Sequence, residues 1–239
     1  MSLPKINTPE YKLNIPSTDE EITYRPFLVK EEKILLIAQE TGDENAQYLA
    51  IQNLIESCVT EKIEVEQLPL FDMEYIFLNI RAKSVGEIAN LKIICPDDDK
   101  TTADVTVDLT KVNVHMDDAH NPKIELTDTI GMLMQYPSIG LIGQATNMGE
   151  QNAKSAEQMF ELVSNCMYQI WEGEEVHECS DYTETEKVAF LESLNHSQFE
   201  KIQKFFDTMP TLKHDIEVTN PKTGVKSTVT LRGISSFFE

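Results

Sequence analysis

Residues 88–109 read IANLKIICPDDDKTTADVTVDL, and this stretch decides the fold class. Apolar and polar residues alternate on either side of a polar turn at residues 96–100, which is the pattern of half-buried β-strands. We therefore predict strands at residues 88–95 and 103–109 that form a hairpin. Helical periodicity before and after this stretch makes the chain an α+β protein.

The N-terminal part combines another hairpin with three helices. Residues 10–15 and 21–24 alternate around a turn at residues 17–19, which predicts two short strands. Apolar residues then recur at spacings of three and four, which predicts helices. The predicted helices cover residues 29–40, residues 44–58 after a capping box at 41–44, and residues 72–82.

A glycine-containing segment suggests a boundary in the chain. Short strands are predicted at residues 111–115 and 123–126, whereas the apolar residues 130–136 fit either a strand or a helical turn. Residues 138–151 then hold three of the nine glycines among polar residues, as linkers do. The predicted division is a domain at 1–140, a linker at 141–151 and a helical part at 152–239.

The C-terminal part is predicted to be helical with a terminal β-hairpin. Apolar spacing indicates a helix from 156 to 171, followed by an acidic exposed loop at 172–186. Capping boxes at Thr183/Glu186 and Ser197/Glu200 predict two more helices. Alternation around the turn at residues 220–224 predicts the last hairpin. The whole fold is thus an N-terminal β-hairpin, helices and a small antiparallel sheet, then this helical part.

The chain is strongly acidic, with 41 Asp and Glu residues, 20 Lys and Arg residues and a net charge of -21. The excess lies before residue 200, because residues 200–239 hold five acids and six bases. Such a charge disfavours nucleic acid and anionic membranes and suits a basic protein partner. No apolar run is long enough for a membrane span, and the first residues are not a signal peptide, so we expect a cytoplasmic protein.

The sequence holds no motif of catalysis or phosphate binding, so we predict no catalytic residue, cofactor or small-molecule substrate. The nearest approach to a metal site is His177-Glu178-Cys179, with Cys166 and His196 nearby. These residues lack the paired spacing of zinc ligands, so we expect no metal. The four cysteines are expected to be free, buried thiols.

Aromatic residues are the candidates for partner contact. Phe237 and Phe238 form an aromatic pair beside the last residue, and Phe27 precedes the first predicted helix. Aromatic side chains often anchor protein interfaces. The alternative is that all three rings lie in the core of the protein itself.

Several unusual segments resemble the T4-type bacteriophage baseplate hub subunit family. They are YRPFLVKEEKILL at 24–36, LPLFD at 68–72, EYIFL at 74–78, RAKSVGE at 81–87 and CPDD at 95–98. The resemblance covers about the first 140 residues. The C-terminal hairpin is also similar to a zinc-ribbon knuckle of related hub-assembly proteins, but Asn220 and Thr223 stand where cysteines would be. This hairpin is therefore expected to be metal-free.

The resemblance implies a late structural or assembly protein of a contractile tail, without enzymatic activity. Its partners would be other baseplate hub or tail proteins, with the tape-measure protein as one candidate. The protein would act in the host cell cytoplasm during assembly and then be part of the virion tail baseplate. An alternative is a tape-measure or hub assembly chaperone that is absent from the mature virion. A small metal-dependent hydrolase is the alternative from another class.

Overall fold

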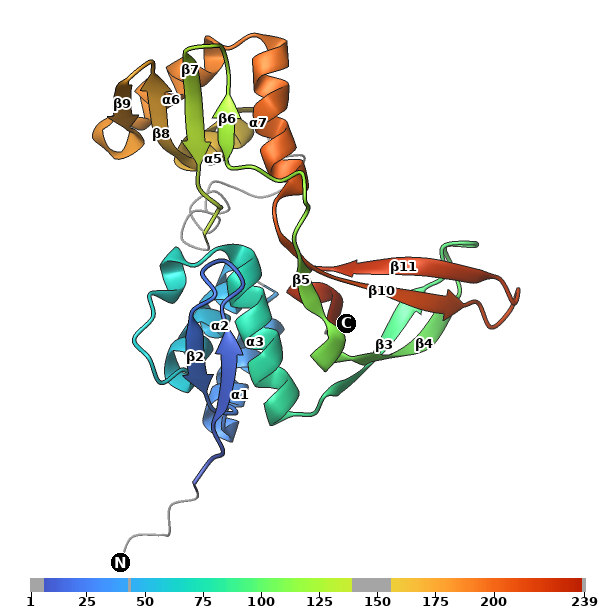
Figure 1. Cartoon of the computed structure of the whole chain (residues 1–239). Helices are drawn as coiled ribbons and strands as arrows, with labels where there is room; N and C mark the ends of the chain where they lie inside the picture. The colour runs from blue at the N-terminus through green and yellow to red at the C-terminus, as the bar shows by residue number, and fades with distance from the viewer. Residues whose placement is uncertain (1–6, 43, 139–155, 238–239) are drawn as a thin grey trace, which may run out of the picture. The chain divides into compact units, whose positions relative to one another are not determined.

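The computed structural model describes residues 7–42, 44–138 and 156–237, which form two compact units (Figure 1). Unit 1 comprises Met1–His115 and Thr211–Glu239, and unit 2 comprises Met116–Pro210. The chain thus leaves unit 1 and later returns to it, whereas the sequence-based division kept the C-terminal hairpin with the preceding helices. The linker predicted at 141–151 lies outside the described residues.

Unit 1 is built around one helix, most of whose residues are buried. β1 (Tyr11–Asn14) and β2 (Glu21–Tyr24) form an antiparallel hairpin, as predicted. The helices are α1 (Val29–Thr41), α2 (Glu44–Cys58) and α3 (Leu70–Ser84), with a short 3-10 helix, η1 (Val65–Gln67), before α3. Because α3 buries side chains on nearly every side, it is the centre against which the other elements pack.

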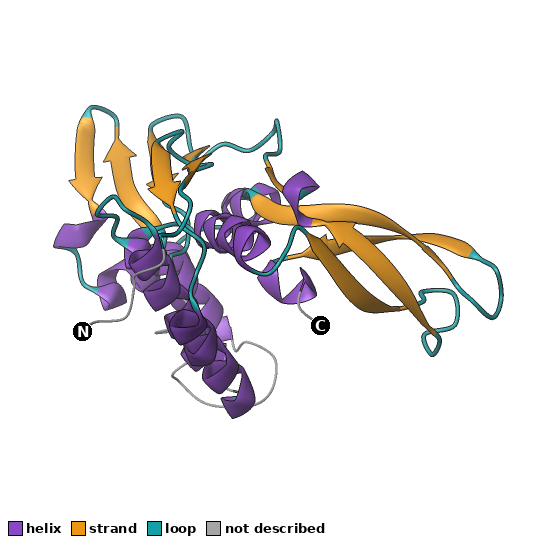
Figure 2. Ribbon diagram, turned by 90° about the horizontal axis from the view of Figure 1, so that it is seen from below, coloured by secondary structure: helices purple, strands orange, loops and turns teal. Residues whose placement is uncertain are grey.

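Strands from two distant parts of the chain complete unit 1. β3 (Ile88–Ile94) pairs with β4 (Thr102–Asp108), and a short 3-10 helix, η2 (Leu109–Lys111), follows. A second sheet has the order β11-β10-β5, from β5 (Asn113–His115), β10 (Thr211–Thr219) and β11 (Lys226–Arg232). Figure 2 shows the two hairpins lying together as extended ribbons. Their alternating apolar side chains share one core with α3 and Phe237 of η4 (Ile234–Phe237).

The tips of these two hairpins are tied by hydrogen bonds. Asn220 Nδ2 donates to both carboxylate oxygens of Asp97, at 2.9 and 3.1 Å, and Thr223 Oγ1 donates to Asp97 Oδ2 at 2.6 Å. These two donors lower the pKa of Asp97. Asn220 and Thr223 thus act as hydrogen-bond donors to a carboxylate.

Unit 2 packs helices against an antiparallel sheet of order β6-β7-β8-β9. The strands are β6 (Lys123–Glu125), β7 (Ile130–Met134), β8 (Met167–Glu172) and β9 (Glu175–Glu178). The helices are α5 (Ala156–Asn165), α6 (Glu184–Glu192) and α7 (His196–Thr208), and a 3-10 helix, η3 (Cys179–Asp181), follows β9. Trp171 lies directly over Gly131, where an added Cβ would be 2.0 Å from Trp171 Cζ2, so only glycine fits there.

The α+β class is confirmed, but three local predictions in unit 2 are corrected. The helix predicted to reach residue 171 ends at Asn165, because apolar residues at 167, 170 and 171 fit a half-buried strand equally well. The acidic segment predicted to be a loop forms β9, η3 and the start of α6. Asn195, not Ser197, caps α7, with Gln198 completing the capping box. Residues 130–134, which the sequence left open, form strand β7.

Candidate functional site

Helix α1 leaves several large apolar side chains exposed to solvent. Val29 is 79% exposed, Leu36 54% and Ile37 52%, and the helix buries only Glu31 and Ala38. Val29 and Leu36 are seven residues apart, so they lie on the same side of the helix, two turns from each other. Several large apolar side chains exposed on one helix are a candidate surface for protein–protein contact.

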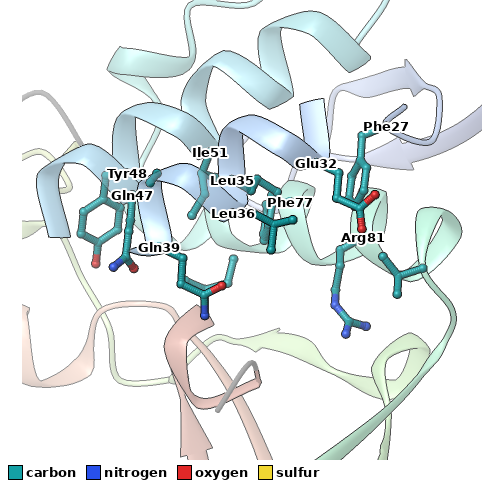
Figure 3. A pocket seen from close by; sticks show the side chains of 13 residues that line it. Phe27, Glu32, Leu35, Leu36, Gln39, Gln47, Tyr48, Ile51, Phe77 and Arg81 are labelled. Atoms are coloured by element: carbon teal, nitrogen blue, oxygen red, sulfur yellow. The ribbon is translucent and has the colours of Figure 1, made fainter. Parts of the chain in front are cut away.

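A cavity of about 530 Å³ adjoins this exposed side of α1, and we call it the α1 groove (Figure 3). Apolar side chains from all three helices line it, among them Leu35, Ile51 and Phe77, while Glu32 and Arg81 add charge. Leu36 belongs both to the groove and to the exposed side of the helix. The complete lining is Phe27, Glu32, Leu35, Leu36, Ala38, Gln39, Gln47, Tyr48, Ile51, Phe77, Arg81, Val85 and Ile234.

A hydrogen-bonded cluster fixes the start of α1 beside the groove. Arg25 Nη2 pairs with Glu31 Oε1 at 3.0 Å and donates to the Ser57 carbonyl at 2.8 Å. Glu31 Oε2 accepts from the Leu28 N–H at 2.7 Å. Burial acts to raise the pKa of Glu31, but the bonds from Leu28, Arg25 and Lys30 outweigh it and the pKa is lowered. The ionised carboxylate therefore holds the N-terminus of α1 in place.

Two carboxylates buried on α3 hold other segments of unit 1. Asp72 is completely buried and accepts hydrogen bonds from the N–H and the hydroxyl of Ser17, in the turn between β1 and β2. Glu74 is 5% exposed, and its Oε1 accepts from the Ile234 N–H at 3.0 Å. Burial raises the pKa of both groups, that of Glu74 to about 7. Each carboxylate binds a backbone N–H of another segment, so both serve to hold the fold together.

The structure separates the three aromatic residues predicted to contact a partner. Phe27 lines the α1 groove and is partly buried. Phe237 is completely buried in the core of unit 1, so its ring is not on the surface and the partner-anchor expectation does not fit its position. Phe238 lies outside the described residues. The groove thus brings Phe27 together with Ile234 of the C-terminal segment.

The apolar run at residues 34–37 was not singled out from the sequence beyond the helix predicted over it. Consecutive residues on a helix are about 100° apart. Four apolar residues in a row therefore surround the helix, and they cannot all face one core. That run is the sequence signal of an exposed apolar surface, and Ile34 and Ile37 are indeed each about half exposed.

The described residues offer no grouping suited to a metal. Within them, no three His, Cys, Asp or Glu side chains come together in a way that holds an ion. The residues that the sequence offered as metal ligands have other neighbours. His177 Nδ1 lies 2.9 Å from the Tyr182 hydroxyl, and His196 Nε2 lies 3.4 Å from Glu200 Oε1. Cys166 and Cys179 are buried free thiols, and burial raises the pKa of each.

No helix in the described part of the chain has the length and hydropathy that crossing a membrane requires.

Comparison with known proteins identifies the family. No curated protein and no solved structure matches the chain. The family described as T4 bacteriophage base plate protein, in contrast, matches residues 8–239, which includes the segments around α1 and α3. A match over nearly the whole length shows that the chain belongs to the T4 bacteriophage base plate protein family.

Proposed function

We propose that this protein is a structural component of the central baseplate hub of a contractile-tailed phage, and that the α1 groove binds another baseplate or tail protein. Family membership supports the baseplate role and contacts with other tail proteins. The single observation that carries the site is the exposed apolar side of α1, which continues into the groove. The protein acts by binding, without catalysis.

The strength of such a contact follows from the area that remains exposed. Full burial of a Leu or Ile side chain contributes roughly 1.5–3 kcal/mol. Leu36 and Ile37 are each about half exposed, so covering both contributes about 2 kcal/mol to binding, or about a thirtyfold change in affinity. The double variant L36Q/I37Q removes this contribution, while glutamine preserves helix propensity.

The experiment is complementation of a phage that lacks the gene, with completed baseplates counted by electron microscopy. We expect L36Q/I37Q to reduce baseplate completion with little change in thermal stability. The matched control is I88T/I94T on β3, which removes two apolar side chains of similar exposure, 54% and 60%, from another part of unit 1. Normal completion with L36Q/I37Q, or equal defects in both variants, would rule out the α1 groove as the binding site.

A second measurement concerns the hub and the fate of the protein. Cross-linking followed by mass spectrometry of assembled baseplates is expected to join unit 1 to hub proteins. Mass spectrometry of purified virions then separates a permanent component from an assembly chaperone. Detection in virions supports the structural role, whereas detection in infected cells alone supports a hub or tape-measure chaperone.

A further inference from the structure

Unit 2 has its own cavity, of about 370 Å³, between the β8–β9 hairpin and α6. Its apolar walls are Ile130 of β7, Ile170 of β8 and Phe190 of α6. The hydrogen bond between His177 and Tyr182 links β9 to the segment before α6, and both side chains also line the cavity. No residue of this cavity belongs to the α1 groove, so the two sites are independent.

Acidic residues are dense in the segment that forms much of this cavity, and one lysine, Lys187, also lines it. Residues 172–186 hold seven acids and no base, and all seven side chains are exposed. We call them the acidic face: Glu172, Glu174, Glu175, Glu178, Asp181, Glu184 and Glu186. None of these carboxylates forms an ion pair with any residue that the structure describes. Two of them, Glu172 and Glu186, line the cavity itself.

The strand register places two of these like charges directly opposite each other. Glu172 of β8 faces Glu175 of β9 at the end of the hairpin, and Glu174 lies in the turn between them. Like charges in directly opposed positions destabilise a sheet. A cationic side chain placed between them would relieve this repulsion, so the hairpin itself favours a positively charged occupant.

The same region presents groups that hold a peptide. β9 is at the edge of the described sheet, so one side of its backbone is available for pairing with another strand. Tyr182, which lines the cavity, is 42% exposed. An exposed aromatic side chain beside an apolar cavity is typical of the centre of an interface.

We propose that the acidic face and its cavity bind a basic segment of a second protein, which inserts one apolar side chain between Ile130, Ile170 and Phe190. Charge attraction guides the encounter and selects the partner, and the buried apolar side chain gives the complex its lifetime. Two copies of this chain do not pair through this face, because two such acidic faces repel each other. The inference goes beyond the α1 groove by giving the chemistry of a second partner.

The test uses the full-length protein and overlapping synthetic peptides that cover the other baseplate and tail proteins of the phage. Binding is measured by fluorescence anisotropy at low and high salt. We expect the bound peptides to carry net positive charge and an apolar residue, and to bind more weakly as salt rises. Replacing the apolar residue of such a peptide by serine is expected to weaken its binding.

Two protein variants with the same change in net charge locate the site. E172Q/E174Q/E175Q removes three carboxylates of the acidic face, and D118N/E125Q/D207N removes three exposed carboxylates elsewhere in unit 2. Exposed ion pairs are individually weak, so we expect about a tenfold loss of affinity in the first variant and a much smaller loss in the second. Fluorescence of Trp171 confirms that unit 2 is folded in both.

Methyl NMR of isoleucine-labelled protein then tests the cavity directly. A bound peptide is expected to shift the Ile130 and Ile170 signals and leave the Ile51 signal of the α1 groove unchanged. The proposal is overturned if no peptide binds, if bound peptides lack basic residues, or if both variants lose affinity equally. A shift confined to Ile51 also overturns it, while it leaves the proposed role of the α1 groove intact.

Discussion

Replacing Glu74 by glutamine is expected to make unit 1 more stable at neutral and higher pH. The carboxylate is 5% exposed and accepts a single hydrogen bond, from the Ile234 N–H. Burial raises its pKa from 4.5 to about 7, against the smaller opposing effect of that bond. Glutamine keeps an acceptor oxygen at the same place and cannot ionise, so it removes the cost of the buried charge.

The sign of the pH dependence follows from the two pKa values. Between pH 4.5 and about 7, the unfolded chain has released the Glu74 proton while the folded chain still holds it. Stability therefore falls as pH rises through this window and is constant above it. This difference between the two pKa values corresponds to about 3 kcal/mol in the free energy of unfolding. E74Q should therefore be more stable than the parent by about that amount at pH 8 and equally stable at pH 4.

The measurement is urea unfolding, monitored through the hydrogen exchange of backbone amides in β3 and β10. This readout is needed because the single tryptophan, Trp171, lies in unit 2 and reports on the other unit. E217Q on β10 is the matched control, because it makes the same chemical change at an exposed position of unit 1. If E74Q follows the parent at every pH, or is less stable than the parent at pH 8, then Glu74 does not carry the cost assigned to it.

Four further substitutions test the packing and the capping of the fold. F237A is expected to destabilise unit 1 by about 3–5 kcal/mol in the same exchange assay, and unchanged stability would place the Phe237 ring outside the core. T183A removes the cap of α6 and should cost about 1 kcal/mol by thermal unfolding, while S197A, in the first turn of a helix capped by Asn195, should cost less; equal losses would contradict this assignment. G131A should disrupt unit 2 and change the fluorescence of Trp171, whereas a normally folded variant would show that the ring does not lie against residue 131.

The sequence by itself determined the elements that depend on local pattern. Alternation with a period of two predicted the strand pairs around residues 15–20, 95–101 and 219–226, and all three hairpins form. Spacings of three and four predicted α1, α2 and α3 within a few residues. The capping box at Thr183 and Glu186 is present because a short side chain bonds to a backbone group three residues away, which needs no tertiary contact.

The site could be predicted only in part. The sequence indicated Phe27 as a candidate contact residue. The four consecutive apolar residues at 34–37 also indicate surface exposure, because they surround the helix and cannot all face one core. Sequence alone offered no means of telling that Phe237 is buried while Val29 is exposed, because both are apolar residues near the edge of an element. Exposure depends on which other segments cover a side chain, and that is a property of the assembled fold.

The tertiary structure alone decided how the units are composed. β10 pairs with β5, about a hundred residues earlier in the chain, and Ile234 reaches back to Glu74 on α3. Local periodicity is the same whether a strand pairs with a neighbour in sequence or with a distant strand. The distant strand is preferred because this pairing buries the side chains of Leu78, Leu91 and Ile216 together. Only that shared burial offsets the entropy cost of closing so long a loop.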